Sequence, residues 1–356
     1  MLSRFTKLRI GLAGALILGL FTLPTPAGSQ ANPSSDATAF GKVAVFKGEA
    51  SVNGRPLRQG VTVFEGDRIL TLEGKVEIRS GRSKFLIGPH SDIKLGPSLA
   101  KGQSYLELLK GTLKSFINRV LFRKKIQHLS FRVKTPTVVV GVRGTEFMVH
   151  ATERAGLLFN QEGVVSFTAA GETIRVDASH MSQGGEDIVP LEAQSVLAHE
   201  TLEALLKEVE HYVDLRVPPA ISAKKDLNNI IARFNLNYAG YLIDKKAFHK
   251  AKKLCDLAFL FADMRDLKSE ALLHKATLSF RFLRDERGAL EDLNRIIERY
   301  GDTVHAEHAL YYKGQIHFSL GETVTAGKVL KRYLQTYPQG RFKESARAIL
   351  GQIPGS

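Results

Sequence analysis

The sequence predicts two structural parts: a mainly β N-terminal domain, either an antiparallel sandwich or a β-roll, followed by an all-α solenoid. Up to about residue 190, short runs that alternate apolar and polar residues recur between turn residues, which indicates strands. Beyond that point apolar residues recur three and four positions apart, which indicates helices. The 356 residues, 44% of them hydrophobic, are enough for two cores.

Residues 1–31 have the pattern of a secretory signal peptide. Three basic residues precede an uncharged apolar run of 14 residues at 10–23, and small residues follow at 29–31. That run is shorter than the ~20 residues that span a membrane. We therefore expect cleavage near Ala31 (cleavage after Ala27 also fits), a periplasmic location if the source is Gram-negative, and a mature chain that spans no membrane. No cysteine follows the cleavage site to carry a lipid anchor.

Residues 41–190 are predicted to form the β-domain. Runs such as "KVAVF", "KVEIRS", "SFRVKT" and "VVSFT" are separated by glycine-containing turns about ten residues apart, a pattern typical of sandwiches and rolls. Asn53-Gly54 predicts a tight hairpin, because such turns require positive φ.

The run "TPTVVVGVRGTEFMV" at 135–149 is strand-like but interrupted by glycines. Pro136 suits the start or edge of a strand, and Val138 to Val140 are expected to be buried on both faces. Gly141 and Gly144 predict a kink or bulge. A bulge at Gly144 would place the side chains of Arg143 and Glu146 on the same side of the strand, where they could pair. The predicted structural motif comprises Pro136, Gly141, Arg143, Gly144, Thr145, Glu146 and Phe147, with Arg143 paired to Glu146 or Glu162 and Phe147 in the core.

The helical half begins with a predicted connecting helix and linker over 191–217, ended by Pro218-Pro219. Three similar segments then start at Ala251, Ala289 and Ala326, at spacings of 38 and 37 residues, each preceded by another helix. A repeated helix pair of this period predicts an α-solenoid over 220–353, in which each unit packs on its neighbours. The segment "RFKESARAILGQI" is a predicted capping helix.

The third helix pair resembles the tetratricopeptide repeat family, because Gly314, His317, Ala326, Tyr333 and Pro338 fall on its spacing of small, large and proline positions. The first two pairs depart from the pattern, with Asp263 or Gly301 in place of the proline. The resemblance implies a concave surface that binds a protein partner.

The β-half resembles the FecR domain family over about residues 41–170. The resemblance is carried by "TPTVVVGVRGTEFMV" together with "GEASVNGRPLRQGVTVFEGDRILT", "LIGPHSDIKL", "LKGTLKSF" and "NQEGVVSF". It implies a mostly antiparallel β-fold used for protein contact and signal relay, without catalytic residues. The best-known members are transmembrane regulators of iron uptake with a cytoplasmic anti-sigma segment. Only nine residues precede the apolar run here, so we do not expect an anti-sigma regulator.

Positive charge is concentrated in one segment of the β-half. The net charge is +14, and it stays at +11 once the three basic residues of the signal peptide are removed. From 108 to 145 there are nine basic residues and no acidic one. This segment is either a strip that binds an anionic envelope polymer or lipid, or a solvated insertion between strands. The candidate anion-binding residues are Arg119, Arg123, Lys124, Lys125, Arg132 and Lys134.

Catalytic and metal-binding patterns are weak. His305 and His308 lie three residues apart beside Glu307, but no third ligand is recognisable, so surface histidines are the favoured interpretation. Asp177, Ser179 and His180 occur together without a nucleophile-elbow pattern. Cys255, the only cysteine in the sequence, excludes an internal disulfide and is predicted to lie in a helical core.

The sequence therefore predicts an exported, non-catalytic cell-envelope protein that binds or scaffolds other proteins, with no metal or cofactor. The alternative is a binding protein for an anionic envelope polymer or lipid surface through residues 110–134, and a hydrolase without a recognisable motif is less favoured. Nucleic acid is not an expected partner, because the chain is exported and its basic run lacks interleaved stacking aromatics.

Overall fold

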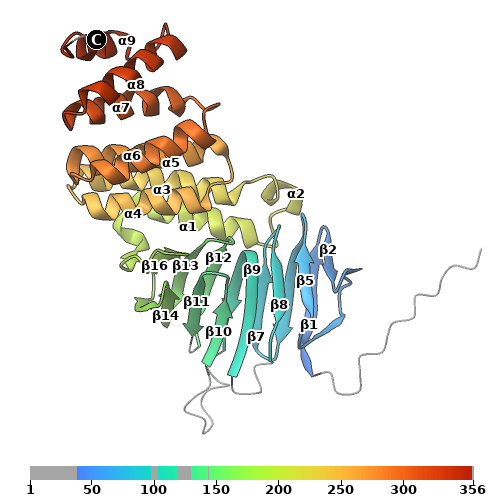
Figure 1. Cartoon of the computed structure of the whole chain (residues 1–356). Coiled ribbons are helices and arrows are strands. Elements are labelled where there is room, and N and C mark those ends of the chain that lie inside the picture. The colour runs from blue at the N-terminus through green and yellow to red at the C-terminus, as the bar shows by residue number, and fades with distance from the viewer. Residues whose placement is uncertain (1–37, 98–102, 119–129, 143, 355–356) are drawn as a thin grey trace, which may run out of the picture. The chain divides into compact units, whose positions relative to one another are not determined.

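The computed structural model describes residues 38–97, 103–118, 130–142 and 144–354. Strands up to residue 195 are followed by helices from residue 200 onward, as the sequence predicts (Figure 1). The predicted signal peptide and its cleavage site near Ala31 lie outside the described residues. From Thr38 onward the chain forms one compact unit.

The strands are short except for β9, which runs for 14 residues. Their bounds are β1 Ala39–Lys47, β2 Ala50–Val52, β3 Arg55–Pro56, β4 Thr62–Phe64, β5 Arg68–Thr71, β6 Lys75–Ser80, β7 Ser83–Ile87, β8 Asp92–Leu95, β9 Gln103–Phe116, β10 Ser130–Lys134, β11 Val138–Val142, β12 Glu146–Ala151, β13 Ala155–Glu162, β14 Val164–Ala169, β15 Glu172–Asp177, β16 His180–Gly185 and β17 Gln194–Ser195.

The helices begin after a short 3₁₀ turn, η3, at Val196–Ala198. Their bounds are α1 Glu200–Val213, α2 Pro219–Ser222, α3 Leu227–Asp244, α4 Phe248–Phe261, α5 Arg265–Phe282, α6 Glu286–Arg299, α7 His305–Ser319, α8 Thr323–Thr336 and α9 Lys343–Leu350.

The strands form two layers that share β9. In the first sheet the order is β4-β1-β6-β7-β9-β12-β13-β16-β17. In the second sheet it is β3-β2-β5-β8-β9-β10-β11-β14-β15. Every pairing in these two orders is antiparallel except that of β9 with β10, which is parallel. The β-half is therefore a mostly antiparallel, two-layered structure.

Glycine allows β9 to pass from one sheet to the other. Its residues up to Lys110 pair in the second sheet, and those from Gly111 onward pair in the first. Gly111 has φ +97°, and a Cβ atom there would lie 2.2 Å from the Ser91 hydroxyl oxygen. Any larger residue would face both an unfavourable backbone conformation and a clash.

The first sheet is buried on both faces at β12, β13 and β16, because helices form a third layer on this part of it. In β12, Phe147 and Val149 belong to the core between the sheets, whereas Met148 packs with the helices. In β13, Leu158 faces the sheets, whereas Leu157 and Phe159 share a core with residues of α1, α3 and α4. The β-half and the helical half therefore share one hydrophobic core.

Three helix pairs, α3/α4, α5/α6 and α7/α8, stack along the chain, and α9 packs on the last pair (Figure 1). These are the repeats that the spacing predicts. The connecting segment differs from the expectation of a helix beginning at Leu191. Leu191 donates its amide to the Gln183 carbonyl, and β17 (Gln194–Ser195) pairs with β16, so β17 extends the first sheet and α1 begins only at Glu200. The backbone groups of this segment form hydrogen bonds with the edge of the sheet, so they are not available for a helical turn.

The run at 135–149 also differs in detail from its prediction. β11 is regular through Gly141, which pairs with Arg132 and Ser166 without a bulge. The glycine is needed instead because a Cβ atom there would lie 2.5 Å from the Ser166 hydroxyl oxygen. Val139 is only half-buried, so the valine run is not buried on both faces.

Candidate functional site

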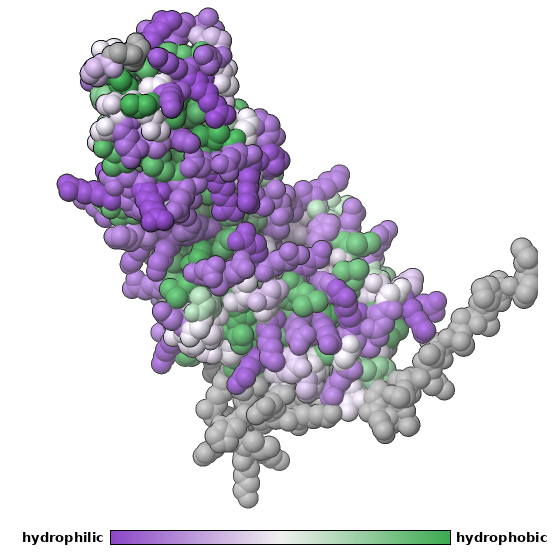
Figure 2. Space-filling model, in the orientation of Figure 1, coloured by the Kyte–Doolittle hydropathy of each residue, from purple (hydrophilic) through white to green (hydrophobic). Residues whose placement is uncertain are grey.

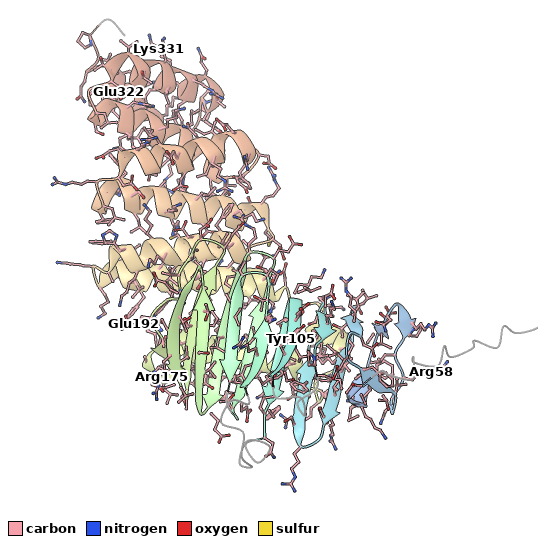
Figure 3. The ribbon with its side chains drawn as sticks, turned by 60° about the horizontal axis from the view of Figure 1, so that its bottom comes forward. Arg58, Tyr105, Arg175, Glu192, Glu322 and Lys331 are labelled. Carbon is pink, nitrogen blue, oxygen red and sulfur yellow. The ribbon has the colours of Figure 1, made fainter. Side chains whose placement is uncertain are left out.

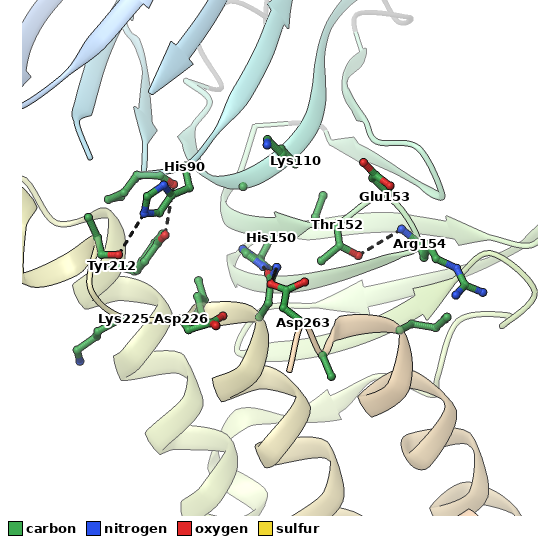
Figure 4. Close-up of a pocket in the computed structure, with 18 of the residues that line it drawn as sticks. His90, Lys110, His150, Thr152, Glu153, Arg154, Tyr212, Lys225, Asp226 and Asp263 are labelled. Atoms are coloured by element: carbon green, nitrogen blue, oxygen red, sulfur yellow. Dashed lines mark hydrogen bonds between the residues drawn. The ribbon is translucent and has the colours of Figure 1, made fainter. Parts of the chain in front are cut away.

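A cavity lies where the β-half meets the helical half. It has a volume of about 610 Å³ and opens between turns of the sheets and the first residues of α3 and α5 (Figure 4). Its charged and polar lining residues come from both halves: His90, Lys110, His150, Thr152, Glu153, Arg154, Tyr212, Lys224, Lys225, Asp226, Asn228, Asp263 and Lys268. We call this cavity the junction cleft.

A chain of hydrogen bonds crosses the wall of the junction cleft. His150 in β12 is 4% exposed, and its Nδ1 lies 2.8 Å from the Thr112 hydroxyl oxygen in β9. Its Nε2 lies 2.7 Å from Oδ1 of Asn228 in α3, and the Asn228 amide nitrogen donates to Asp263 at 2.8 Å. Because the Asp263 carboxylate can only accept, it orients the Asn228 amide so that Oδ1 faces the imidazole. Nε2 of His150 therefore carries the proton, and Nδ1 accepts from Thr112.

Burial keeps this imidazole neutral. Desolvation lowers the pKa of His150 from 6.5 to about 4, while the hydrogen bond to Asn228 and the charge of Asp263 oppose the shift. With both ring nitrogens engaged, His150 serves to hold strand β12 against α3. It is not presented to the cleft as a general base.

Several charges of the junction cleft are paired within the chain. Lys225 pairs with Glu208 of α1 at 2.5 Å, and Arg154 pairs with Glu186 at 2.9 Å. Asp226 caps α3 by accepting the amide of Asn229 at 3.2 Å. The cleft thus contains a mixture of both signs, much of it committed to fixing the two halves together.

A buried lysine makes a second connection between the halves. The side chain of Lys75 in β6 is inaccessible to solvent, and its Nζ donates to the carbonyl oxygens of His211, Asp214 and Val217 at 3.4, 2.7 and 3.3 Å. These carbonyls lie in or just beyond the last turn of α1, where cations are favoured by the helix dipole. Desolvation lowers the pKa of Lys75 to about 8.

A third connection is a reciprocal pair of amides. Gln183 in β16 donates to the Asn235 oxygen in α3 at 2.9 Å, and Asn235 donates back to Gln183 at 3.0 Å. Both side chains are buried, so each satisfies the polar atoms that the other would leave without a partner.

The predicted motif residues lie at a corner between the sheets. Gly144 has φ +68° and falls between β11 of the second sheet and β12 of the first. Pro136 precedes β11, and Thr145 and Phe147 are buried. Glu146 forms an ion pair with Lys114 at 2.9 Å. Arg143 lies outside the described residues, and with it the predicted pairing to Glu146 or Glu162.

The structure places the described part of the basic segment in two strands. Arg132 in β10 is exposed, whereas Nζ of Lys134 lies 3.9 Å from the ring centroid of Tyr105. Lys110 and Lys114 belong to β9, and Lys114 also approaches Glu210 at 3.4 Å. Part of the charge is therefore neutralised inside the fold. Arg119, Arg123, Lys124 and Lys125 lie outside the described residues.

The other candidate groups have structural partners. His305 Nδ1 lies 2.9 Å from the Ser269 hydroxyl, and His308 packs edge-on against Phe342. Within the described ranges, no three His, Cys, Asp or Glu side chains are grouped to hold a metal ion. Asp177 pairs with Arg175, whereas His180 bonds to the Ala178 carbonyl. Cys255 is 1% exposed in α4, and burial raises the pKa of its thiol to about 12.

Known proteins resemble two parts of the chain. The model of the FecR protein family matches residues 67–166, and a tetratricopeptide repeat model matches residues 308–340. No curated protein sequence matches the chain. Two crystal structures of a proposed anti-sigma factor from Parabacteroides distasonis ATCC 8503, at 1.65 and 2.50 Å resolution, are similar at 12% identity and a TM-score of 0.31. The likeness covers 35% of this chain and 57% of theirs.

Among the helices that the structure describes, none combines the length and apolar character that a membrane span requires. The two family matches fall in different halves of the fold, one in the sheets and one in the last helix pair with the turn that follows. The chain therefore joins a FecR segment at residues 67–166 to a tetratricopeptide repeat at residues 308–340.

Proposed function

We propose that this protein is an exported, non-catalytic component of the cell envelope that binds other proteins in a sensing or assembly role. The observation that carries the proposal is the shared core between the first sheet and the helices. Helical repeats use their extended surfaces for protein binding. Because the repeats here are fixed on the FecR-containing half, a partner bound along the helices is held in a defined position relative to that half.

The hydrogen-bonded connection between the halves also supports a relay role. A ligand at one site influences another only through elements that respond to both. Here α1 and α3 contact the sheet directly through Lys75, His150 and Gln183. A partner on the helices and one on the sheets would therefore act on the same interface.

Export is tested by fractionating cells of the source organism and sequencing the N-terminus of the protein. We expect it in the periplasmic fraction with a new N-terminus after Ala31, or after Ala27. An intact Met1, or a lipid-modified N-terminus, would contradict export as proposed.

Protein binding is tested by site-specific photo-cross-linking in intact cells. A photoreactive amino acid replaces Asn237 of α3 or His274 of α5, which are exposed, and Arg175 on edge strand β15 serves as the matched control on the β-half. We expect discrete cross-links to an envelope protein from the helical positions. Absence of cross-links at both helical positions overturns the proposal, and recovery of a sigma factor from the cytoplasm replaces it with an anti-sigma role.

A further inference from the structure

Of the eight large apolar side chains that are exposed in the described helical half, five lie at one end of the helix pairs. Within each pair, a short turn joins the first helix to the second. Leu197, Tyr241, Phe282, Leu320 and Val324 lie at or beside this end of the stack, with exposures of 77, 36, 47, 46 and 71%. Large apolar residues at this exposure mark interaction sites when they recur together. We call this surface the turn edge.

Ring contacts show that the turn edge continues from one element to the next. His199, which precedes α1, lies 4.5 Å from the Tyr241 ring near the end of α3. Phe248, the first residue of α4, stacks on Phe282, the last residue of α5, at 4.4 Å and 11°. In Figure 3, Glu192, which pairs with Lys250 beside the first turn, lies on the same side of the molecule as Glu322 in the third turn.

The turn edge carries an excess of positive charge between its apolar groups. Residues 244–250 and 281–287, which contain the first two turns, hold six basic and three acidic residues, and one of the six, Lys250, is neutralised by Glu192 at 2.7 Å. Lys245, Lys246, Arg281 and Arg284 are all exposed, whereas the carboxylate of Asp285 is neutralised by Lys252 at 2.7 Å. Figure 2 shows hydrophobic residues interspersed with hydrophilic ones over the helical half. Such a surface attracts an acidic partner.

A helix with one apolar face suits a surface on which apolar groups follow one another from turn to turn. The stacked rings of Phe248 and Phe282 join the first turn to the second. In an α-helix, residues seven apart on one face are separated by about 10.5 Å, because each residue rises 1.5 Å. A helix of roughly 15 to 20 residues is therefore about 22–30 Å long and presents a row of apolar groups along one face.

We infer that the turn edge binds an acidic amphipathic helix of a partner protein. This inference rests on the proposed protein-binding function and specifies the chemistry of the partner. The apolar stripe of the bound helix contacts the five apolar residues of the turn edge, Leu197, Tyr241, Phe282, Leu320 and Val324. Its acidic flanks face the lysines and arginines of the first two turns.

The test uses the full mature chain and three fluorescein-labelled 18-residue peptides. The first has leucines on one helical face and glutamates on the other, the second has lysines for glutamates, and the third has serines for leucines. We expect the leucine–glutamate peptide to bind at least tenfold more tightly than either of the others in fluorescence anisotropy. Equal binding of all three peptides, or no binding of the first, overturns the inference.

Charge at the turn edge can be removed without straining the backbone. Lys246 and Arg284 have φ values of +59° and +53° at equivalent turn positions, where the third turn has Gly321 at +77°. The double variant Lys246→Gly/Arg284→Gly therefore keeps a favourable turn geometry while removing two charges. We expect it to bind the first peptide at least fivefold more weakly.

The apolar contribution is measured with Leu197→Ser/Leu320→Ser/Val324→Ser, which should weaken binding at least tenfold. The matched control is Met264→Ser/Val304→Ser, because these residues are 53 and 77% exposed at the opposite end of the helix pairs. A control that loses as much affinity as the turn-edge variant overturns the inference.

The outcomes separate the inference from the function on which it rests. If the envelope cross-links form equally in wild type and turn-edge variants, protein binding stands and the inference is wrong. If the peptide binds as expected but no envelope cross-link forms, the proposed function is wrong while the turn edge remains a docking surface. Charge-dependent binding to phosphatidylglycerol vesicles with no peptide binding assigns the edge to a lipid surface instead.

Discussion

At the scale of single residues, His150 links folding stability to pH. Its pKa is about 4 in the fold against 6.5 for an ordinary histidine, because the buried imidazole is held neutral. Between these two values the unfolded chain binds a proton that the folded chain does not. The stability contribution of neutral His150 is therefore complete above about pH 6.5 and is lost as the pH falls toward 4.

We predict that lowering the pH from 7 to 5 costs the wild type about 2 kcal/mol more than it costs a His150→Gln variant, since each pKa unit corresponds to about 1.4 kcal/mol. Chemical denaturation at both pH values measures the difference. The subtraction removes the contributions of the other histidines, which both proteins retain. Equal losses in the two proteins would show that His150 titrates near its ordinary value.

Lys75 gives a second prediction at this scale. Lys75→Met removes the ammonium group that donates three part-buried hydrogen bonds to carbonyl oxygens at the end of α1. We expect a loss of about 2–4 kcal/mol in the free energy of unfolding, because a hydrogen bond to a charged group contributes about 1.5–3 kcal/mol. Lys84→Met is the control: Lys84 lies 4.0 Å from the Phe116 ring centroid and is half-buried, so its loss should cost below 1 kcal/mol. Similar losses for both variants would argue against a capping role.

At the scale of elements, β9 depends on Gly111 to belong to both sheets. We predict that Gly111→Ala lowers the free energy of unfolding by about 3 kcal/mol or more, from positive φ together with the clash with Ser91. Gly171→Ala isolates the cost of a positive φ, because Gly171 has φ +79° and open space at its Cβ position. This substitution should lower the free energy of unfolding by about 1 kcal/mol. Urea denaturation of both variants measures the comparison, and equal losses would remove the steric part of the argument.

The elements also show what the sequence could predict. Strands and helix pairs were predictable because the spacing of apolar residues along each element indicates which of its sides is buried. The Asn53-Gly54 hairpin was predictable for a local reason, and the structure confirms it with φ of +50° and +76°. The division of β9 between two sheets was not predictable. Gly111 in "LLKGTLKSF" indicates an irregularity in the strand, but it does not indicate which strands pair with the residues before and after it.

The side chains that join the two halves were also not predictable from the sequence, for a related reason. Lys75 opens the run "KVEIRS" and resembles a surface residue, yet α1 covers it. His150 ends the run "EFMVH", where an outward polar side chain is usual, yet Asn228 of α3 covers it and bonds to Nε2, and Asp263 in the α4–α5 connection orients Asn228. Their burial comes from residues more than seventy positions away, which no local pattern records. The residues 191–199 were misassigned because an apolar spacing typical of a helix also suits a strand followed by a 3₁₀ turn.

At the scale of the whole molecule, the shared core bears on where the chain can be divided. The sequence predicts that residues 32–190 and 219–356 fold separately. In the structure, the face of the first sheet formed by Met148, Leu157, Phe159 and Met181 is covered by helices, and α1 is the first of these to follow the sheets. A fragment that ends at residue 190 would leave that face in water and also remove β17 from the edge of the sheet.

We therefore predict that residues 32–217 form a more stable β-domain than residues 32–190. The longer fragment retains β17, α1 and the Lys75 contacts, so it buries part of the apolar face and satisfies the lysine. We expect a cooperative urea transition for 32–217, and for 32–190 a lower midpoint with increased binding of the dye ANS, which reports exposed apolar surface. Residues 219–356 supply the comparison for the helical half, where the removal of α1 exposes apolar residues of α3. Equal midpoints for 32–190 and 32–217 would show that the β-domain is complete at residue 190, and that the helices are docked onto a sheet that does not need them.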